Sequence, residues 1–221
     1  MYKTLEQQVI AALKAHGLTL ATAESCTGGL TAKRLTDVPG ASAVFLGGVV
    51  SYTNGVKERV LGVPHGTLEA YSAVSDPTAR AMAEGVRTLT GADFGLSVTG
   101  VAGPDRDDAG HDVGTVYVAL STRNETAAQL LHLSGDRSAI RAAAVAHAQH
   151  LRMQFALQCE DAGRIDHLAL GRDRCGVRPD RGKVQQGRVQ LLRKRNAPAG
   201  NFYDFSQIQS HSAPRTIALV L

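Results

Sequence analysis

Hydrophobic and polar positions change period repeatedly along the first three quarters of the chain, and these changes predict the secondary structure. In residues 4–17, apolar side chains recur every three or four positions on one helical face, at Leu5, Val9, Ile10 and Leu13. Thr4 with Gln7 three residues later predicts a capping box at the start of this helix, and Gly17 predicts its end. Similar helical patterns follow, from Gly28 or Gly29 to residue 35 and then over 57–61, 76–90 and 138–158.

Short apolar runs rich in β-branched residues separate these helices and predict strands. They cover residues 18–23, 43–52, 94–99, 115–121 and 126–133. The last two are joined by a hairpin-sized connection at 123–125, which predicts an antiparallel pair. Strands interleaved with helices indicate an α/β protein, specifically a three-layer α/β/α sandwich with a mixed sheet.

The distribution of charge divides the chain into two parts. Residues 1–159 carry 13 Lys and Arg against 14 Asp and Glu, whereas residues 160–221 carry 11 against 6. The whole chain has 43% hydrophobic residues, which is enough for one well-buried domain with some chain left over. The second part has weak periodicity and predicts a flexible basic tail, with a nucleic-acid-binding arm as the less favoured interpretation.

Composition narrows the possible classes of protein. The sequence has no run of 18 apolar residues and begins without an apolar signal-peptide core, so we expect a cytoplasmic protein that does not bind membranes. The three cysteines, Cys26, Cys159 and Cys175, are odd in number and widely spaced, which does not suggest a disulfide framework. Because no paired C-x-x-C accompanies them, we expect neither a metal site nor another cofactor.

Three loops carry candidate chemistry, and each follows a predicted strand, where open α/β sheets bind ligands. The first reads Glu24-Ser25-Cys26-Thr27-Gly28-Gly29. Ser25 lies just before a helix, and the N–H groups of Thr27, Gly28 and Gly29 could hold an anion or a developing oxyanion. Taken alone, the loop is more typical of an ordinary helix start capped by Ser25 or Thr27. Cys26 is an alternative nucleophile, although a small packed residue is the favoured interpretation.

The second loop, Ser51-Tyr52-Thr53-Asn54-Gly55-Val56-Lys57, offers a base. A serine hydroxyl needs a base to become a nucleophile, and Lys57 could serve if burial lowers its pKa. Tyr52 could relay or orient a proton. The alternative for Lys57 is an ordinary surface lysine in a turn, which spacing alone does not exclude.

The third loop, Val98-Thr99-Gly100-Val101-Ala102-Gly103-Pro104, is rich in glycine but matches neither the P-loop nor the Rossmann spacing. The Thr99 hydroxyl suits a phosphate or amide contact. Arg137, at the start of the last long helix, could clamp a phosphate through its planar guanidinium. The alternatives are a structural turn and an arginine that faces water.

Taken in order, the loops and several shorter motifs resemble the CinA C-terminal domain family over roughly residues 4–158. The matching segments are Ala23–Gly29, Asp37–Ser42, Gly47–Asn54, Leu61–Val63, Ala73–Ser75, Val98–Pro104, Val113–Val116 and Gly135–Arg137. This family includes nicotinamide-nucleotide amidases. The resemblance implies hydrolysis of the carboxamide of nicotinamide mononucleotide to nicotinate mononucleotide and ammonia.

The resemblance also implies roles for individual residues. Ser25 would be the nucleophile, Lys57 its general base and Tyr52 an assisting group. The substrate would be contacted by Cys26, Thr27, Gly28, Gly29, Thr99, Gly100 and Arg137. A metal or cofactor would not be needed, the partner would be a small pyridine nucleotide, and the protein would form a homodimer.

One segment departs from the family pattern, in which paired glycines follow the Gly-Pro of the third loop. Here the loop continues as Gly103-Pro104-Asp105-Arg106-Asp107-Asp108-Ala109-Gly110-His111-Asp112. Two alternatives to the nucleotide amidase therefore stay open. One is a serine amidase for a less anionic amide, which an acidic loop would suit. The other is a non-catalytic module linked to competence or DNA damage, with the basic tail contacting nucleic acid.

Overall fold

The computed structural model describes the backbone of residues 3–161 and the side chains up to residue 150. The helices are α1 (Leu5–His16), α2 (Leu30–Thr36), η1 (Ala41–Ala43), α3 (Asn54–Leu61), α4 (His65–Tyr71), α5 (Asp76–Thr90) and α6 (Arg137–Asp161). The strands are β1 (Leu20–Glu24), β2 (Phe45–Val50), β3 (Phe94–Gly100), β4 (Thr115–Ser121) and β5 (Thr126–His132). The basic segment 160–221 lies almost entirely outside the described residues, so the predicted domain boundary and tail stay predictions.

The five strands form one mixed sheet in the order β2-β1-β3-β4-β5. β1 pairs in parallel with both β2 and β3, whereas β4 is antiparallel to β3 and to β5. The mixed sheet and the antiparallel hairpin agree with the sequence-based prediction.

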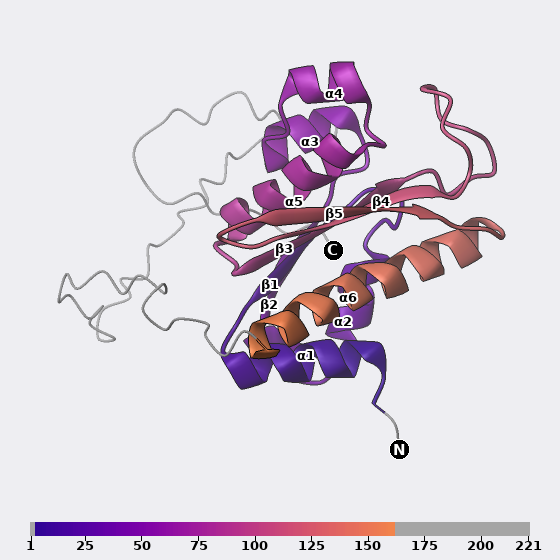
Figure 1. Cartoon of the computed structure of the whole chain (residues 1–221). Helices are drawn as coiled ribbons and strands as arrows, with labels where there is room; N and C mark the ends of the chain where they lie inside the picture. Colours follow the sequence, from indigo (N-terminus) through magenta and orange to yellow (C-terminus); the bar gives the residue numbers. More distant parts are fainter. Residues whose placement is uncertain (1–2, 162–221) are drawn as a thin grey trace, which may run out of the picture. The chain divides into compact units, whose positions relative to one another are not determined.

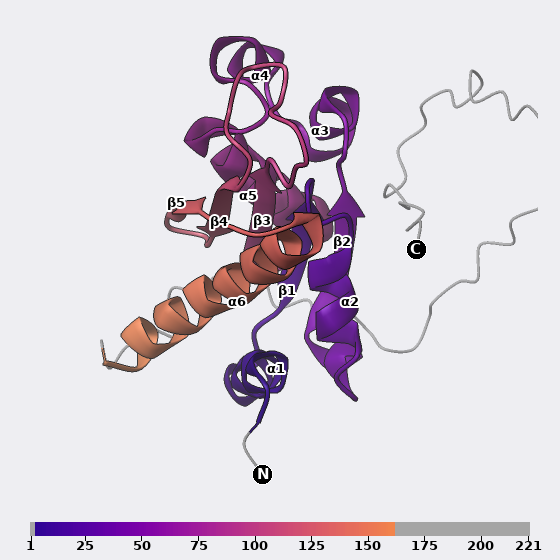
Figure 2. The same cartoon turned by 90° about the vertical axis from the view of Figure 1, so that its right-hand side faces the viewer.

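Helices cover both faces of the sheet, which confirms the three-layer α/β/α architecture. Helices α1, α2 and α6 lie on one face and α3, α4 and α5 on the other, as Figures 1 and 2 show from two directions. Helix α5 packs on β1, β3 and β4, and α6 packs on β3 and β4 from the opposite side. The largest buried cluster fills the space under α1 and α6, with Leu13, Leu20, Leu96 and Ile140 among its members.

Local signals in the sequence explain most of the helix ends. The capping box of α1 is present, because the Thr4 hydroxyl accepts from the Gln7 amide and the Gln7 side chain accepts from the Thr4 amide. Helix α3 begins at Asn54, however, so it starts three residues before the helix predicted over 57–61 and includes Asn54 and Gly55 in its first turn. Helix α4 was not expected, because its seven residues bury little apolar surface beyond Leu68.

The three parallel strands bring their carboxyl ends to one edge of the sheet. The Ser25 amide donates to the carbonyl oxygen of Val98 (2.9 Å), and the Ser51 amide donates to that of Glu24 (2.8 Å). These bonds continue the pairing of β1 with its two neighbours just past the strand ends. As a result, the loop after central β1 lies between the loops that follow β2 and β3, which is the arrangement expected for a ligand site.

Candidate active site

The turn after β1 is held in place by the carboxylate of Glu24. This side chain is 1% exposed and accepts backbone N–H groups from Gly29 (3.1 Å), Thr31 (2.9 Å) and Ala32 (2.8 Å). An acidic group at a helix N-terminus satisfies unpaired donors and interacts favourably with the helix dipole. Glu24 therefore caps α2, and Ser25 and Thr27 do not, since the helix has no side-chain cap from its own first residues.

The glycines of this turn serve its backbone path. Gly28 and Gly29 have φ values of +58° and +91°, which residues with a side chain adopt at a cost. The Gly28 amide donates to the Ser25 carbonyl oxygen (3.1 Å), and the Gly29 amide donates to Glu24. The expectation that both amides are available for an oxyanion is therefore wrong. Within the described residues, the amides of Cys26 and Thr27 donate to no other residue, and of these two residues only Cys26 lines the cavity described below.

Lys57 of α3 contacts the Ser25 hydroxyl directly. Its Nζ donates to Ser25 Oγ (3.1 Å) and to the carbonyl oxygen of Ser51 (2.8 Å). Lys57 is 1% exposed and Ser25 is 9% exposed, so the pair is nearly closed off from bulk water. Burial lowers the pKa of Lys57 from 10.5 to about 8, because the charged ammonium loses hydration that the neutral amine hardly needs. A lysine with this pKa is a competent base near neutral pH.

Burial has the opposite effect on the neighbouring thiol. Cys26 is 6% exposed, and burial raises its pKa from 9.0 to about 12. The thiolate is the nucleophilic form of cysteine, and it is scarcely populated at such a pKa. Cys26 also belongs to the main hydrophobic cluster. Both observations favour Cys26 as a packed residue and Ser25 as the nucleophile.

Arg137 connects the second and third loops across the site. Its Nη2 donates to the Tyr52 hydroxyl (3.0 Å), and its Nη1 donates to the carbonyl oxygen of Gly103 (2.5 Å). Tyr52 is 58% exposed, and its hydroxyl bonds to Arg137, not to Ser25 or Lys57. Tyr52 is thus placed to orient Arg137 at the rim of the site.

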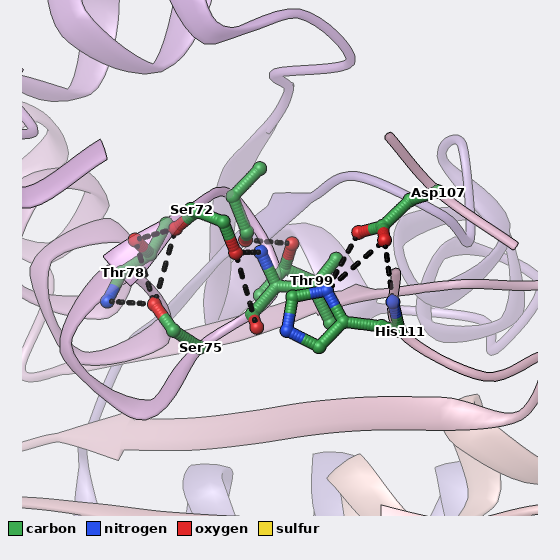
Figure 3. A network of polar contacts seen from close by, with 8 residues as sticks. Ser72, Ser75, Thr78, Thr99, Asp107 and His111 are labelled. Atoms are coloured by element: carbon green, nitrogen blue, oxygen red, sulfur yellow. Dashed lines mark hydrogen bonds and ion pairs between the residues drawn. The ribbon is translucent and has the colours of Figure 1, made fainter. Parts of the chain in front are cut away.

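The third loop is anchored by Thr99 from inside the protein. Thr99 is fully buried, and its hydroxyl donates to the carbonyl oxygen of Ala73 (2.7 Å). Figure 3 shows Thr99 beside a group of polar contacts that includes Ser75. The Ser75 hydroxyl caps α5 by accepting the Thr78 amide. Gly100 has a packing role, because a Cβ there would lie 2.6 Å from the carbonyl oxygen of Thr115.

These residues surround one cavity of about 270 Å³. The predicted site residues that line it are Ser25, Cys26, Tyr52, Lys57, Thr99, Gly100 and Arg137. Thr27, Gly28 and Gly29 do not line it. The acidic loop also reaches the cavity, through Asp105, Arg106 and Asp107. The predicted site residues therefore make up only part of the cavity wall.

Three contributions were not predicted, namely the cap by Glu24, the Ser51 carbonyl that holds Lys57, and Arg141. Arg141, one turn after Arg137 on α6, donates from Nη2 to the carbonyl oxygen of Thr27 (2.7 Å). The spacing of the two arginines was a readable signal, since residues four apart share a helix face. A backbone carbonyl such as that of Ser51 leaves no signal in the sequence.

No helix among the described residues is long and apolar enough to cross a membrane. No group of three or more His, Cys, Asp or Glu side chains within 3–150 is arranged to hold a metal ion.

Comparisons with known proteins agree on one family. The model of the CinA C-terminal domain matches residues 2–155. A putative competence-damage inducible protein of Thermoanaerobacter sp. (strain X514) is 53% identical over 153 residues, which are 69% of this chain and 37% of that protein. A CinA-like protein of Geobacter sulfurreducens is 51% identical over 138 residues, 62% of this chain and 33% of the relative. The chain thus spans about a third of the length of these relatives.

Solved structures show the same similarity. A CinA superfamily protein from Klebsiella pneumoniae superposes with a TM-score of 0.68 at 36% identity, covering 70% of this chain and 96% of that one. The competence/damage inducible protein CihA from Agrobacterium tumefaciens gives a TM-score of 0.66 at 38% identity, covering 70% and 97%. On the family match and these relatives, the chain belongs to the CinA C-terminal domain family.

Proposed function

We propose that the protein is an amidohydrolase that converts nicotinamide mononucleotide to nicotinate mononucleotide and ammonia. The observation that carries this proposal is the buried contact of 3.1 Å between Lys57 Nζ and Ser25 Oγ, together with the Lys57 pKa of about 8. A nucleophile within hydrogen-bond reach of a base is the arrangement that covalent catalysis requires. The names of the relatives refer to competence and damage and do not specify a reaction.

The proposed first step is acylation of Ser25. Neutral Lys57 takes the hydroxyl proton while Ser25 Oγ forms a bond to the carboxamide carbon, and the amide oxygen becomes an oxyanion. The amide of Cys26, which lines the cavity beside Ser25 and donates to no other residue within the described part of the chain, would donate to that oxyanion. The Lys57 ammonium then gives its proton to the nitrogen, the carbon–nitrogen bond breaks and ammonia leaves.

The second step is hydrolysis of the resulting ester. Lys57, neutral again, removes a proton from a water molecule, whose oxygen attacks the ester carbon. The carbon–oxygen bond to Ser25 breaks, Lys57 returns the proton to Ser25 Oγ, and the carboxylate product is released. Each proton that Lys57 accepts is thereby returned, and no redox partner is required.

The charged rim of the cavity supports a phosphorylated substrate. Arg137 uses two of its five N–H donors for Tyr52 and Gly103, so other donors of its guanidinium stay available for a phosphate. Arg106 lines the same cavity and pairs with the exposed Asp112 at 2.5 Å. The proposal includes cytoplasmic location and homodimeric assembly, which the family resemblance supports and a mass measurement in solution would test.

The test is release of ammonia and nicotinate mononucleotide by the full chain. We expect turnover by the wild type and its loss in Ser25→Ala and in Lys57→Met. Matched controls change the same residue types away from the cavity, namely exposed Ser42→Ala and Lys33→Met, whose lysine is 66% exposed and pairs with Asp37. An inactive wild type, or full activity in Ser25→Ala, would show that the proposed function is wrong.

A further inference from the structure

The loop between β3 and β4 brings carboxylates to the cavity that contains the Ser25–Lys57 pair. Asp105 and Asp107 line this cavity together with the cationic side chains of Lys57, Arg106 and Arg137. The wall therefore carries both signs of charge. This part of the wall is the segment in which the chain departs from the paired glycines of the family pattern.

Asp107 is the better fixed of the two carboxylates. Its Oδ1 accepts the His111 backbone amide (2.8 Å), and its Oδ2 lies 2.8 Å from His111 Nδ1. Figure 3 shows the carboxylate facing the His111 ring and amide. The Asp107 side chain is 26% exposed. Burial raises the pKa of Asp107, but the hydrogen bonds from His111 outweigh that effect and lower it below 3.8. Asp107 is therefore ionised and held in one orientation at neutral pH.

The proposed substrate has a charge that such a carboxylate would recognise. A nicotinamide ring bonded through its nitrogen to ribose is a pyridinium cation, and the attached phosphate is an anion. A cavity lined by cations alone would favour the phosphate but repel the ring that carries the reacting carboxamide. A carboxylate on the same wall removes that repulsion and attracts the ring.

We propose that Asp107, assisted by Asp105, selects the charged pyridinium form of the nicotinamide ring over the uncharged dihydropyridine form. The substrate class is then the oxidised, zwitterionic nicotinamide nucleotides, and their reduced counterparts are rejected. This inference rests on the proposed amidase function and refines it. It also gives the acidic loop a role that does not require a less anionic substrate.

The experiment compares two ligands that differ in ring charge. Oxidised and reduced nicotinamide mononucleotide share the carboxamide, ribose and phosphate, and calorimetry on the full-length Ser25→Ala variant measures their dissociation constants without turnover. The quantity of interest is the ratio of the two affinities. It is measured with the loop unchanged and with Asp107→Asn or Asp105→Asn added. Asp108→Asn is the matched control, because exposed Asp108 is next in the loop but does not line the cavity.

We expect Ser25→Ala to bind the oxidised form more tightly, and Asp107→Asn to lower the affinity ratio by about five- to tenfold. Affinity for the reduced form should stay constant, and Asp108→Asn should change the ratio by less than about twofold. An equal loss of affinity for both ligands in Asp107→Asn would indicate a structural role for Asp107, and an unchanged affinity ratio without any loss would indicate no role in binding. Either result overturns the inference. Absence of binding of the oxidised form would overturn it as well. Ammonia release by the wild type is scored separately, so failure of the amidase proposal is distinguishable from failure of this one.

Discussion

The pH dependence of the amidase rate tests the Ser25–Lys57 pair most directly, because Lys57 accepts the serine proton only when it is neutral. With a pKa of about 8, roughly 9% of the lysine is neutral at pH 7 and roughly 91% at pH 9. At its ordinary pKa of 10.5, only about 0.03% would be neutral at pH 7. Burial thus increases the population of the active base by about 300-fold at pH 7.

The expected profile follows from these populations. Between pH 7 and pH 9, kcat/KM should rise about tenfold and level off above pH 9, since kcat/KM reports the pKa values of the free enzyme. Ammonia release from nicotinamide mononucleotide at constant ionic strength measures it. Work above pH 7 avoids titration of the substrate phosphate, whose second pKa lies near ~6.

The substitution Lys57→Arg removes the base but keeps the positive charge. The guanidinium stays protonated throughout this range, so the variant should lose about 10²- to 10⁴-fold in kcat/KM at every pH and show no rise. If Lys57→Arg kept the rise in kcat/KM, the rise in the wild type would have to come from a group other than Lys57. A flat wild-type profile between pH 7 and pH 9, or an inflection near pH 10, would refute the assignment of Lys57 as a base activated by burial.

Three further predictions concern stability and the thiol. The pKa of Lys57 falls from 10.5 to about 8 on folding, so the folded state binds this proton less tightly than the unfolded state. The free energy of unfolding of the wild type should therefore fall by about 3 kcal/mol relative to Lys57→Met as pH decreases from 10.5 to 8. Urea unfolding of both proteins measures it, and a difference in free energy that does not change with pH would contradict it. Glu24→Gln should lower the free energy of unfolding by about 2–4 kcal/mol, because one amide oxygen replaces a carboxylate that accepts three N–H groups. Thermal unfolding measures this change, and a value below about 0.5 kcal/mol would argue against the cap by Glu24. Cys26→Ala should keep kcat within about fivefold, and a thiol-alkylating reagent should not inactivate the native protein, whereas rapid inactivation would indicate a reactive thiolate.

The fold was predictable because its signals are local. The period of the apolar residues distinguishes helices from strands, and short connections such as 123–125 define antiparallel neighbours. The same signals placed Ser25 and Lys57 after strands, and Thr99 at the end of a strand, whose carboxyl ends meet. Helix α4 was missed because seven residues with one buried leucine give too little periodicity to separate a helix from a loop.

The chemistry of the Ser25 turn was less predictable, because it depends on which donors other groups already occupy. The sequence shows glycines before a helix, and free amides at Gly28 and Gly29 were a reasonable expectation. The carboxylate of Glu24 folds back onto three amides of the same turn, and this contact depends on a side-chain conformation that no periodicity reports. The burial of Lys57 was equally hidden, because it follows from the packing of α3 on α5 and from the contacts of the lysine with Ser25 and the Ser51 carbonyl.

The proposed reaction makes two electrostatic demands on the cavity, and different residues meet them. The base must lose its proton near neutral pH, whereas a phosphorylated substrate needs positive charge where its phosphate binds. Burial is the main cause that lowers the pKa of Lys57 to about 8. The arginines lie at the rim, where water screens them, and Lys57 lies in the floor beside Ser25. The reactivity of the base is therefore set mainly by its burial, whereas the charges at the rim would serve the binding of the proposed phosphorylated substrate.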